Sequence, residues 1–422
     1  MTMTVKLSEI IKVHHGWPFK SEYFTDVTTN EPIVVNIGNF QYDGGFRFET
    51  TKKKGYVGAY PKEYELSPND ILLVMTCQTA GGEILGIPGR IPDDGKIYLH
   101  NQRLGKVEIL RPDLVDDNYL YWLFLSNDFN KHLFNTASGT KILHTAPSRI
   151  ESYEFALPPL ETQRRIGDIL NSLDEKISIN HRMNETLEQM AMASYKHWFV
   201  DFGPFQDVEF VETESGFIPE GWEFRSLYSL AQFINGMAFK QHDLNDEEHG
   251  LPVIKISELN ADSPKSAKYY AGSFQGKYHL NTGDVLFSWS ASLGIYLWSH
   301  GPALLNQHIF NVKTNGSFSE KTLYFLLKSV IKEFQDIAAG RATTMGHIKK
   351  EHLIEKLLPY PPEETRRIVE TELGQYFELI LSNLQERNTL KEMRDYLLPR
   401  LLSGEIDVKA TEEQAKEVLA CG

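Results

Sequence analysis

Residues 157–166, LPPLETQRRI, have a second version much later in the chain, at residues 360–368, YPPEETRRI. In each copy a Pro-Pro pair precedes acidic residues, and proline and acidic side chains both favour the first turn of a helix. The match continues downstream, where residues 187–190 (LEQM) correspond to residues 390–393 (LKEM). The sequence therefore predicts one long helix after each Pro-Pro pair.

The similarity also extends upstream, so that a large unit is duplicated. The matching segments are 16–20 (GWPFK) and 236–240 (GMAFK), 101–103 (NQR) and 306–308 (NQH), 120–123 (LYWL) and 323–326 (LYFL), and His144 and His347. Such a unit is too long for a solenoid repeat, whose period is roughly 20–50 residues. We expect a duplicated pair, each copy consisting of one domain and one helix.

Composition indicates a globular, reduced protein. The 422 residues, 41% of them hydrophobic, are enough for two to four domains with cores of their own. The two cysteines, Cys77 and Cys421, are too few for a disulfide framework or a four-ligand zinc site. The chain has no apolar run long enough to span a bilayer and no signal-peptide core, which predicts a cytoplasmic protein.

The net charge of −14 bears on the class of partner. No segment of the chain is basic overall, so composition by itself argues against a free-standing nucleic-acid binder. Local basic patches remain compatible with this charge. A partner subunit that supplies most of the phosphate contacts would also be compatible with it.

Each copy begins with short runs typical of strands and continues with a helical pattern. The strand-like runs are 32–37, 70–75 and 104–110 in the first copy, and 252–256, 284–287 and 309–312 in the second. Helices are predicted over 118–134 and over about 320–337 from the spacing of their apolar residues. This order of elements predicts an α+β fold.

The long helices carry heptad seams that become polar at the same point. The first seam is Ile166, Leu170, Leu173, Ile177, Asn180, Asn184, Leu187 and Ala191. After a one-residue slip, the second seam is Val369, Leu373, Tyr376, Ile380, Asn383, Arg387 and Leu390. Polar residues at seam positions fix register and partner. Two seams that match even in their polar break favour helices that pack on each other.

Taken together, these motifs closely resemble specificity subunits of type I restriction-modification systems, over nearly the whole chain. The most specific parts are the two Pro-Pro junctions, residues 173–177 (LDEKI), residues 195–202 and residues 396–404. The resemblance implies that each mixed unit is a target recognition domain for one half of a split DNA sequence. It also implies that the helices pair antiparallel, set the unread gap, and dock two adenine N6-methyltransferase subunits. Restriction would add two motor-nuclease subunits.

The fold class expected is therefore α+β, with two duplicated recognition domains and two long helices packed as an antiparallel coiled coil. The predicted boundaries are 1–157 for the first recognition domain, 158–205 for the first helix, 206–358 for the second recognition domain, 359–405 for the second helix and 406–422 for a flexible tail.

No catalytic residue is predicted in this chain. An adenine N6-methyltransferase of the implied kind needs an Asn/Asp-Pro-Pro-aromatic motif, whereas the two Pro-Pro pairs lie between Leu157 and Leu160 and between Tyr360 and Glu363. No phosphate-binding G-x-x-x-x-G-K-[ST] loop occurs, and the histidines lack metal-ligand spacing. S-adenosylmethionine, ATP and Mg²⁺ are expected on partner subunits, and no cofactor or metal is expected here.

Candidate DNA contacts are polar residues in loops that recur in both copies, together with one lysine run. In the first copy they are Lys52, Lys53, Lys54, Gln78, Thr79, Arg103, Lys141, His144, Ser148 and Arg149. In the second copy they are Ser288, Trp289, Ser290, His308, Arg341, Thr343, Thr344, His347, Lys349 and Lys350. Arg and Lys suit guanine edges, and Ser or Thr suits either base or phosphate. For the Asn-Gln pairs at 101–102 and 306–307, base reading and a structural role at strand ends both stay open.

Three functions are compatible with the sequence. The first is a DNA-recognition and scaffold subunit of a type I restriction-modification complex that binds double-stranded DNA. The second is the same role in a modification-only or type II-like complex, since the nuclease would lie on another chain. The third is a coiled-coil interaction scaffold without a DNA role, which the negative charge favours and the duplicated loops oppose.

Overall fold

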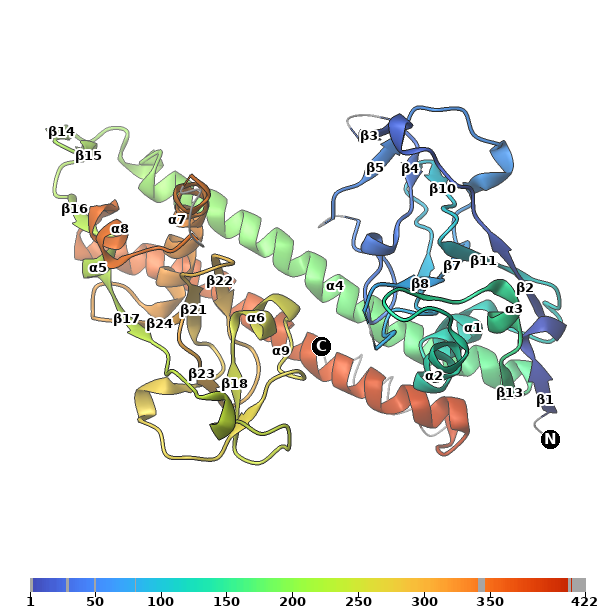
Figure 1. Ribbon diagram of the computed structural model, residues 1–422. Coiled ribbons are helices and arrows are strands. Elements are labelled where there is room, and N and C mark those ends of the chain that lie inside the picture. Colours follow the sequence, from blue (N-terminus) through green and yellow to red (C-terminus); the bar gives the residue numbers. More distant parts are fainter. Residues whose placement is uncertain are drawn as a thin grey trace. The chain divides into compact units, whose positions relative to one another are not determined.

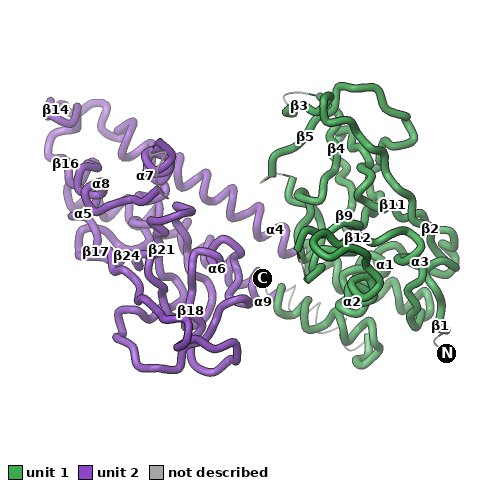
Figure 2. Tube along the Cα trace, viewed as in Figure 1, with its two compact units in different colours: residues 1–175, 391–422 green, residues 176–390 purple. Residues whose placement is uncertain are grey.

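The computed structural model describes residues 3–27, 30–48, 51–79, 81–340, 346–408 and 411. The chain forms two compact units, unit 1 from residues 1–175 and 391–422 and unit 2 from residues 176–390 (Figure 2). Two long helices, α4 (Leu160–Phe199) and α9 (Glu363–Ser403), contribute one stretch each to both units (Figure 1). The fold is α+β, with two duplicated mixed domains and two long helices, which confirms the predicted class.

The mixed part of unit 1 contains a four-stranded antiparallel sheet and a five-stranded sheet. The first has the order β2 (Ile11–His15), β11 (Leu104–Ile109), β7 (Ile71–Val74), β9 (Pro88–Arg90). The second has the order β3 (Phe24–Asp26), β5 (Lys54–Tyr56), β4 (Ile33–Val34), β10 (Tyr98–Leu99), β6 (Glu65–Leu66), with β4 and β10 parallel. Two further pairs join β1 (Met3–Lys6) to β13 (Glu154–Leu157) and β8 (Thr76–Cys77) to β12 (Leu143–His144).

The mixed part of unit 2 repeats this topology. Its antiparallel sheet has the order β17 (Ala231–Asn235), β24 (Ile309–Thr314), β21 (Val285–Ser288), β22 (Gly294–Leu297). Its second sheet has the order β19 (Tyr269–Tyr270), β18 (Leu251–Ile254), β23 (Ala303–Leu305), β20 (His279–Leu280). Strands β16 (Glu223–Ser226) and β25 (Leu357–Tyr360) pair as β1 and β13 do, and a hairpin of β14 (Phe210–Thr213) and β15 (Gly216–Pro219) precedes them.

The short helices differ between the units in one informative place. Unit 1 has α1 (Asp117–Phe124), α2 (Asn127–Thr136) and α3 (Pro147–Glu151), and unit 2 has α5 (Leu227–Leu230), α6 (Ile256–Ala261), α7 (Glu320–Ala339) and α8 (Lys350–Glu355). The prediction of one continuous helix over 118–134 was wrong, because Ser126 caps a new helix by accepting a hydrogen bond from the backbone N–H of Phe129. The second copy is a single helix, α7, as predicted.

The remaining helical turns are 3₁₀ turns. They are Leu7–Glu9, Ser21–Tyr23, Ile37–Asn39, Lys62–Tyr64, Gly203–Phe205, Gln241–Asp243 and Gly276–Tyr278.

A close backbone approach explains why the repeated segments 16–20 (GWPFK) and 236–240 (GMAFK) both start with glycine. Gly16 lies against the backbone of Asn101, and Gly236 lies against the backbone of Asn306. A Cβ atom at either glycine would overlap the facing carbonyl group, so no other residue fits without moving the strand end. The adjacent bridges Trp17–Asn101 and Met237–Asn306 repeat the same register in both units.

The predicted heptad seams are the buried faces of the long helices. In α4 the seam residues Ile166, Leu170, Leu173, Ile177, Asn180, Asn184 and Ala191 are buried. In unit 2, Asn180 donates to Glu386 at 2.6 Å and Asn383 donates to Asn184 at 2.8 Å, so the polar breaks meet each other. Ser194 donates to Glu372 at 2.6 Å, which makes the pairing antiparallel. In unit 1, Arg394 of α9 donates to Asp174 of α4 at 2.9 Å.

Candidate nucleic-acid interface

In unit 1 the polar loop predicted to read DNA crosses the end of a central strand. The loop closes on itself through a bridge between Ser138 and His144, and its end strand β12 pairs with β8. The His144 Nδ1 atom lies 3.1 Å from the Thr76 hydroxyl, and the backbone N–H of Thr145 donates to the carbonyl of Met75 at 2.9 Å. These bonds fix the loop against the carboxyl end of β7.

Unit 2 holds the described end of its corresponding loop in a similar way. His347 bridges to Ser290, and the backbone N–H of Ile348 donates to the carbonyl of Trp289 at 2.9 Å. Trp289 thus occupies the position that Met75 has in unit 1. Three candidate residues of this loop, Arg341, Thr343 and Thr344, lie outside the described residues.

A hollow of about 550 Å³ in unit 1 gathers several of the candidates. Gln78 and Thr79 line it from the loop after β8, and Arg103 lines it from the loop before β11. Its wall also includes Tyr42 and Arg47, which the sequence reading missed. The Arg47 Nε atom donates to the carbonyl of Gly38 at 3.2 Å, so this guanidinium is anchored at the wall. The hollow combines arginine, amide and hydroxyl groups, the set that reads base edges.

The loop after β8 is also held internally. The Thr79 hydroxyl donates to Glu83 and lies 3.1 Å from the Cys77 sulfur. The bond from Thr79 holds the pKa of Glu83 below its ordinary value. Gln78 and Thr79 are both exposed, and the Thr79 hydroxyl is engaged within the loop.

Asn101 has a structural role next to this hollow. Its side-chain Nδ2 donates to Asn36 at 2.9 Å and its Oδ1 accepts from the backbone N–H of Arg103 at 3.2 Å. Both ends of the amide are thus used within the fold. This arrangement supports the structural alternative for Asn101, and the Arg103 side chain beside it is exposed.

In unit 2 the equivalent strand ends carry an aromatic and imidazole cluster. The ring centroids of Trp289 and His308 are 5.1 Å apart, and those of Trp289 and His347 are 6.0 Å apart. The indole N–H of Trp289 donates to the Asn235 side chain at 3.1 Å. Asn235 was not among the residues predicted from the sequence. Three of the predicted residues therefore do come together, on a surface chemically unlike that of unit 1.

Two serines of the same segment are enclosed. Ser288 is fully buried and donates to the carbonyl of Ser292 at 2.5 Å, and Ser290 is also buried. Neither side chain is accessible to a ligand in this structure. For Ser288 the reason is that β21 extends to this residue, one position beyond the predicted strand.

The other candidates fall into separate places. Lys52 pairs with Asp26 at 2.9 Å. Lys53 directly precedes β5 and Lys54 is the first residue of that strand. None of the three lysines lines the hollow. Arg149 donates to the carbonyl of His144 at 3.4 Å and thereby buttresses the loop. The remaining candidates, all exposed, are Lys141, Ser148, Lys349 and Lys350.

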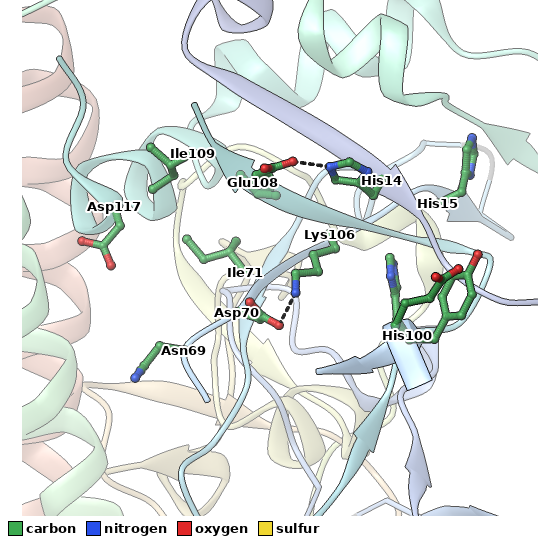
Figure 3. A pocket seen from close by; sticks show the side chains of 13 residues that line it. His14, His15, Asn69, Asp70, Ile71, His100, Lys106, Glu108, Ile109 and Asp117 are labelled. Carbon is green, nitrogen blue, oxygen red and sulfur yellow. Dashed lines mark hydrogen bonds and ion pairs between the residues drawn. The ribbon is translucent and has the colours of Figure 1, made fainter. Parts of the chain in front are cut away.

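Another hollow of unit 1, about 640 Å³, contains charged side chains but none of the predicted contacts (Figure 3). His14 and Glu108 lie 2.6 Å apart, and Lys106 and Asp70 lie 2.6 Å apart, so its central groups pair with one another. His100 in its wall is buried, and burial lowers the pKa of His100 to about 4. Within the described residues, no three His, Cys, Asp or Glu side chains are grouped to hold a metal ion. No helix in the described part of the chain is both long and apolar enough to cross a membrane.

Comparison with protein families decides the class of this architecture. The model of the type I restriction modification DNA specificity domain matches twice, at residues 2–189 and 219–392. The chain belongs to this family. Its function is that of a type I restriction-modification specificity subunit, and the family carries a role in DNA recognition.

Individual relatives are distant in sequence. The HindI specificity subunit of Haemophilus influenzae is 27% identical, over 71% of this chain and 80% of that protein. The MjaVIII specificity subunit of Methanocaldococcus jannaschii is 26% identical, over 82% of this chain and 81% of that protein. Among solved structures, a type I restriction-modification S subunit from M. genitalium has a TM-score of 0.57 at 15% identity, and the match covers 95% of this chain and 96% of that one.

Proposed function

We propose that this specificity subunit recognises a bipartite duplex, one half per mixed unit, and docks adenine N6-methyltransferase subunits. The observation that carries the proposal is the repeated loop. The described end of this loop, at His144 in unit 1 and at His347 in unit 2, lies beside the same strand end, yet the neighbouring side chains differ between the units. One backbone device with two different sets of reading groups suits two different half-sequences.

Exposed apolar residues on the long helices support the docking role. In unit 2 they include Ile179, Met183 and Met190 on α4, and Ile368 and Leu379 on α9. A hollow of about 370 Å³ lies on α4 beside Ile179 and Met183. Apolar surface of this kind on a helix is typical of a protein-binding site. The expected composition is one specificity subunit with two methyltransferase subunits, and two motor-nuclease subunits in a restricting complex.

Division of labour explains the acidic charge of the chain. Partners that hold the phosphates provide the salt-dependent part of the affinity, while this subunit reads base edges. Catalysis would likewise reside on the partners, which would bind S-adenosylmethionine, ATP and Mg²⁺. This chain contributes recognition and assembly and carries out no chemical step itself.

Methylome sequencing tests the proposal. Cells that carry the chain together with its methyltransferase partner are compared with cells that carry the methyltransferase alone. We expect N6-methyladenine in both halves of a split motif, only when the chain is present. A complex that assembles but methylates no specific motif would favour the scaffold without a DNA role. Restriction of unmethylated phage in the same cells separates a complete type I system from a modification-only complex.

A further inference from the structure

Two buried arginines on α9 link the long helices to the recognition domains. Arg387 belongs to unit 2 and Arg394 belongs to unit 1, and both side chains are almost fully enclosed. They are seven residues apart, which places them at the same heptad position of the helix. Each contacts an acidic residue of the mixed domain in its own unit.

In unit 2 the contact involves the end of α6. The Arg387 guanidinium donates to Asp262, the residue that ends α6 with a left-handed backbone at φ 48°. The next residue on α9, Asn388, donates to the Ser299 hydroxyl at 2.9 Å, in the turn between β22 and β23. Two neighbouring residues of α9 therefore hold two separate loops of the domain.

In unit 1 the contact involves Asp43, in the loop that also carries Tyr42 and Arg47 of the hollow of about 550 Å³. Arg394 lies 3.7 Å from Asp43 while it also donates to Asp174 of α4 at 2.9 Å. Asp43 is adjacent to Tyr42, which lines the hollow together with Arg103. The arginine therefore ties the helices to the wall of the candidate recognition surface.

The two acidic partners occupy equivalent places in the duplicated domains. Each follows a helical turn that comes after the corresponding strand, β4 in unit 1 and β18 in unit 2. The turns start alike, since the backbone N–H of Asn36 bonds to Asn39 at 2.8 Å and that of Lys255 bonds to Glu258 at 2.9 Å. Asp43 and Asp262 therefore correspond.

The arginines, in contrast, are not a product of the duplication. The positions of α4 that match Arg387 and Arg394 carry Asn184 and Ala191, both buried. Both guanidinium groups are buried, whereas the side chains of Asp43 and Asp262 are 47% and 42% exposed. Displacement of a domain would take one carboxylate away from a buried guanidinium, so each pair favours one placement of its domain more than it adds to stability. Arg394 would keep its bonds to Asp174 and Asp395 on the helices. One helix has thus acquired an equivalent contact to each domain.

We propose that Arg387 and Arg394 are positioning residues that fix the orientation of each recognition domain on the helices, and thereby restrict the length of the unread gap in the DNA target. The inference rests on the proposed bipartite recognition. Arg387 and Arg394 would leave the choice of bases unchanged, since the reading groups lie on the domains. What they control is how strictly one gap length is preferred.

The test uses the full complex of this chain with its methyltransferase subunits. Duplexes with the natural gap, and with one base pair more or fewer, are methylated in parallel by the wild type and by Arg387→Met and Arg394→Met. The matched control is Arg367→Met, because Arg367 is exposed on the same helix and pairs only with Glu363 one turn away among the described residues. Duplexes with one altered base in either half report on base reading.

We expect each variant at Arg387 or Arg394 to raise methylation of the altered gaps relative to the natural gap by about tenfold, the effect of about 1.4 kcal/mol. Rejection of altered bases should stay as in the wild type, and Arg367→Met should keep the strict gap. If an arginine variant does not assemble, the milder Asp43→Asn and Asp262→Asn variants decide. Retention of the strict gap in assembled variants would overturn the inference alone, whereas a wild type without a split motif would overturn the proposed function.

Discussion

The two mixed domains share their supporting bonds and differ at their strand ends. Asp70 directly precedes β7 and Asp284 directly precedes β21, the corresponding strands of the two four-stranded antiparallel sheets. Each carboxylate accepts from the backbone N–H three residues earlier, at 2.8 Å and 3.0 Å. At the far end of the same sheet Met75 in unit 1 corresponds to Trp289 in unit 2. The duplication has kept the bonds that fix the backbone and has changed the side chains at the strand ends.

The same contrast appears where each long helix begins. In unit 1 the buried Gln163 accepts from the backbone N–H of Asp116, and in unit 2 Glu370 accepts from that of Ser319. Asp116 and Ser319 are the equivalent N-cap residues of α1 and α7. The acceptor on the long helix has moved by about one turn between the copies. The contact is retained while the residue that makes it has changed.

The largest effect is expected from exchange of a whole domain. Replacement of residues 5–157 by the first domain of another family member should change one half of the methylated motif completely and leave the other half and the gap unchanged. The domain is suited to exchange because β1 and β13 bring its first and last residues together. Methylome sequencing measures the motif. The reciprocal exchange of residues 223–360 is the control, and a change in both halves from either exchange would refute independent reading.

A second prediction concerns the bonds at the helix starts. Gln163→Ala should lower the free energy of unfolding by about 3 kcal/mol, because it removes a buried amide and leaves its three half-buried partners without their hydrogen bonds. Those partners are the Leu114 and Pro158 carbonyls and the Asp116 N–H. Glu370→Ala should lower the free energy of unfolding by only about 1 kcal/mol, since among the described residues this half-buried carboxylate bonds to one partner, Ser319. Chemical denaturation of the assembled complex measures the free energy of unfolding of both variants. Equal losses for Gln163→Ala and Glu370→Ala would contradict the predicted difference between the two contacts.

A third prediction distinguishes the units by pH. His100 is buried at the position where unit 2 has Leu305, and its pKa is lowered to about 4. As pH falls below the ordinary histidine pKa of about 6.5, the unfolded chain binds a proton that the folded chain refuses, so stability decreases. Between pH 7 and pH 5 this amounts to about 2 kcal/mol. Thermal unfolding measured between pH 7 and pH 5 should show a smaller loss of stability for His100→Leu than for the wild type. An equal loss in both proteins would exclude His100 as the cause.

The smallest predicted effect concerns single reading groups at equivalent positions. Arg103→Ala should reduce methylation about tenfold, or about 1.4 kcal/mol, and relax the preference at one base of the first half. His308→Ala should act only on the second half. Methylation of duplexes with single-base changes measures both. A loss that is uniform over all sequences, with a weaker salt dependence, would reassign the residue to phosphate contact.

Periodicity was enough to predict the seams of the two long helices. Heptad spacing identified Leu170, Leu173 and Val369 as buried, and it also identified the polar break. The one-residue slip has a visible consequence, since Ile166 is buried whereas Ile368 of the second motif is half exposed. The cap at Ser126 was missed because apolar spacing continued across it. A capping hydroxyl competes with helix continuation in a way that spacing does not register.

The candidate surface was predicted only in part. The repeated loops indicated His144, His347, Arg103 and Trp289, because a duplicated sequence makes recurring polar segments recognisable. Tyr42 and Arg47 have no matching partner in the second copy, so no repeat pointed to them, although they line the same hollow as Gln78. Long-range folding brought them there.

The order of the units along the chain has a consequence for synthesis. Unit 2 is inserted within unit 1, whose last helical stretch begins only at residue 391. Leu397 and Leu401, buried residues of that stretch, leave the ribosome long after the first 175 residues. At about 5–20 residues per second the interval is roughly 10–40 s. During that time the unit 1 stretch of α4 lacks its partner stretch of α9, and its apolar face is uncovered. A chaperone or an early-binding partner would protect the nascent chain in this period.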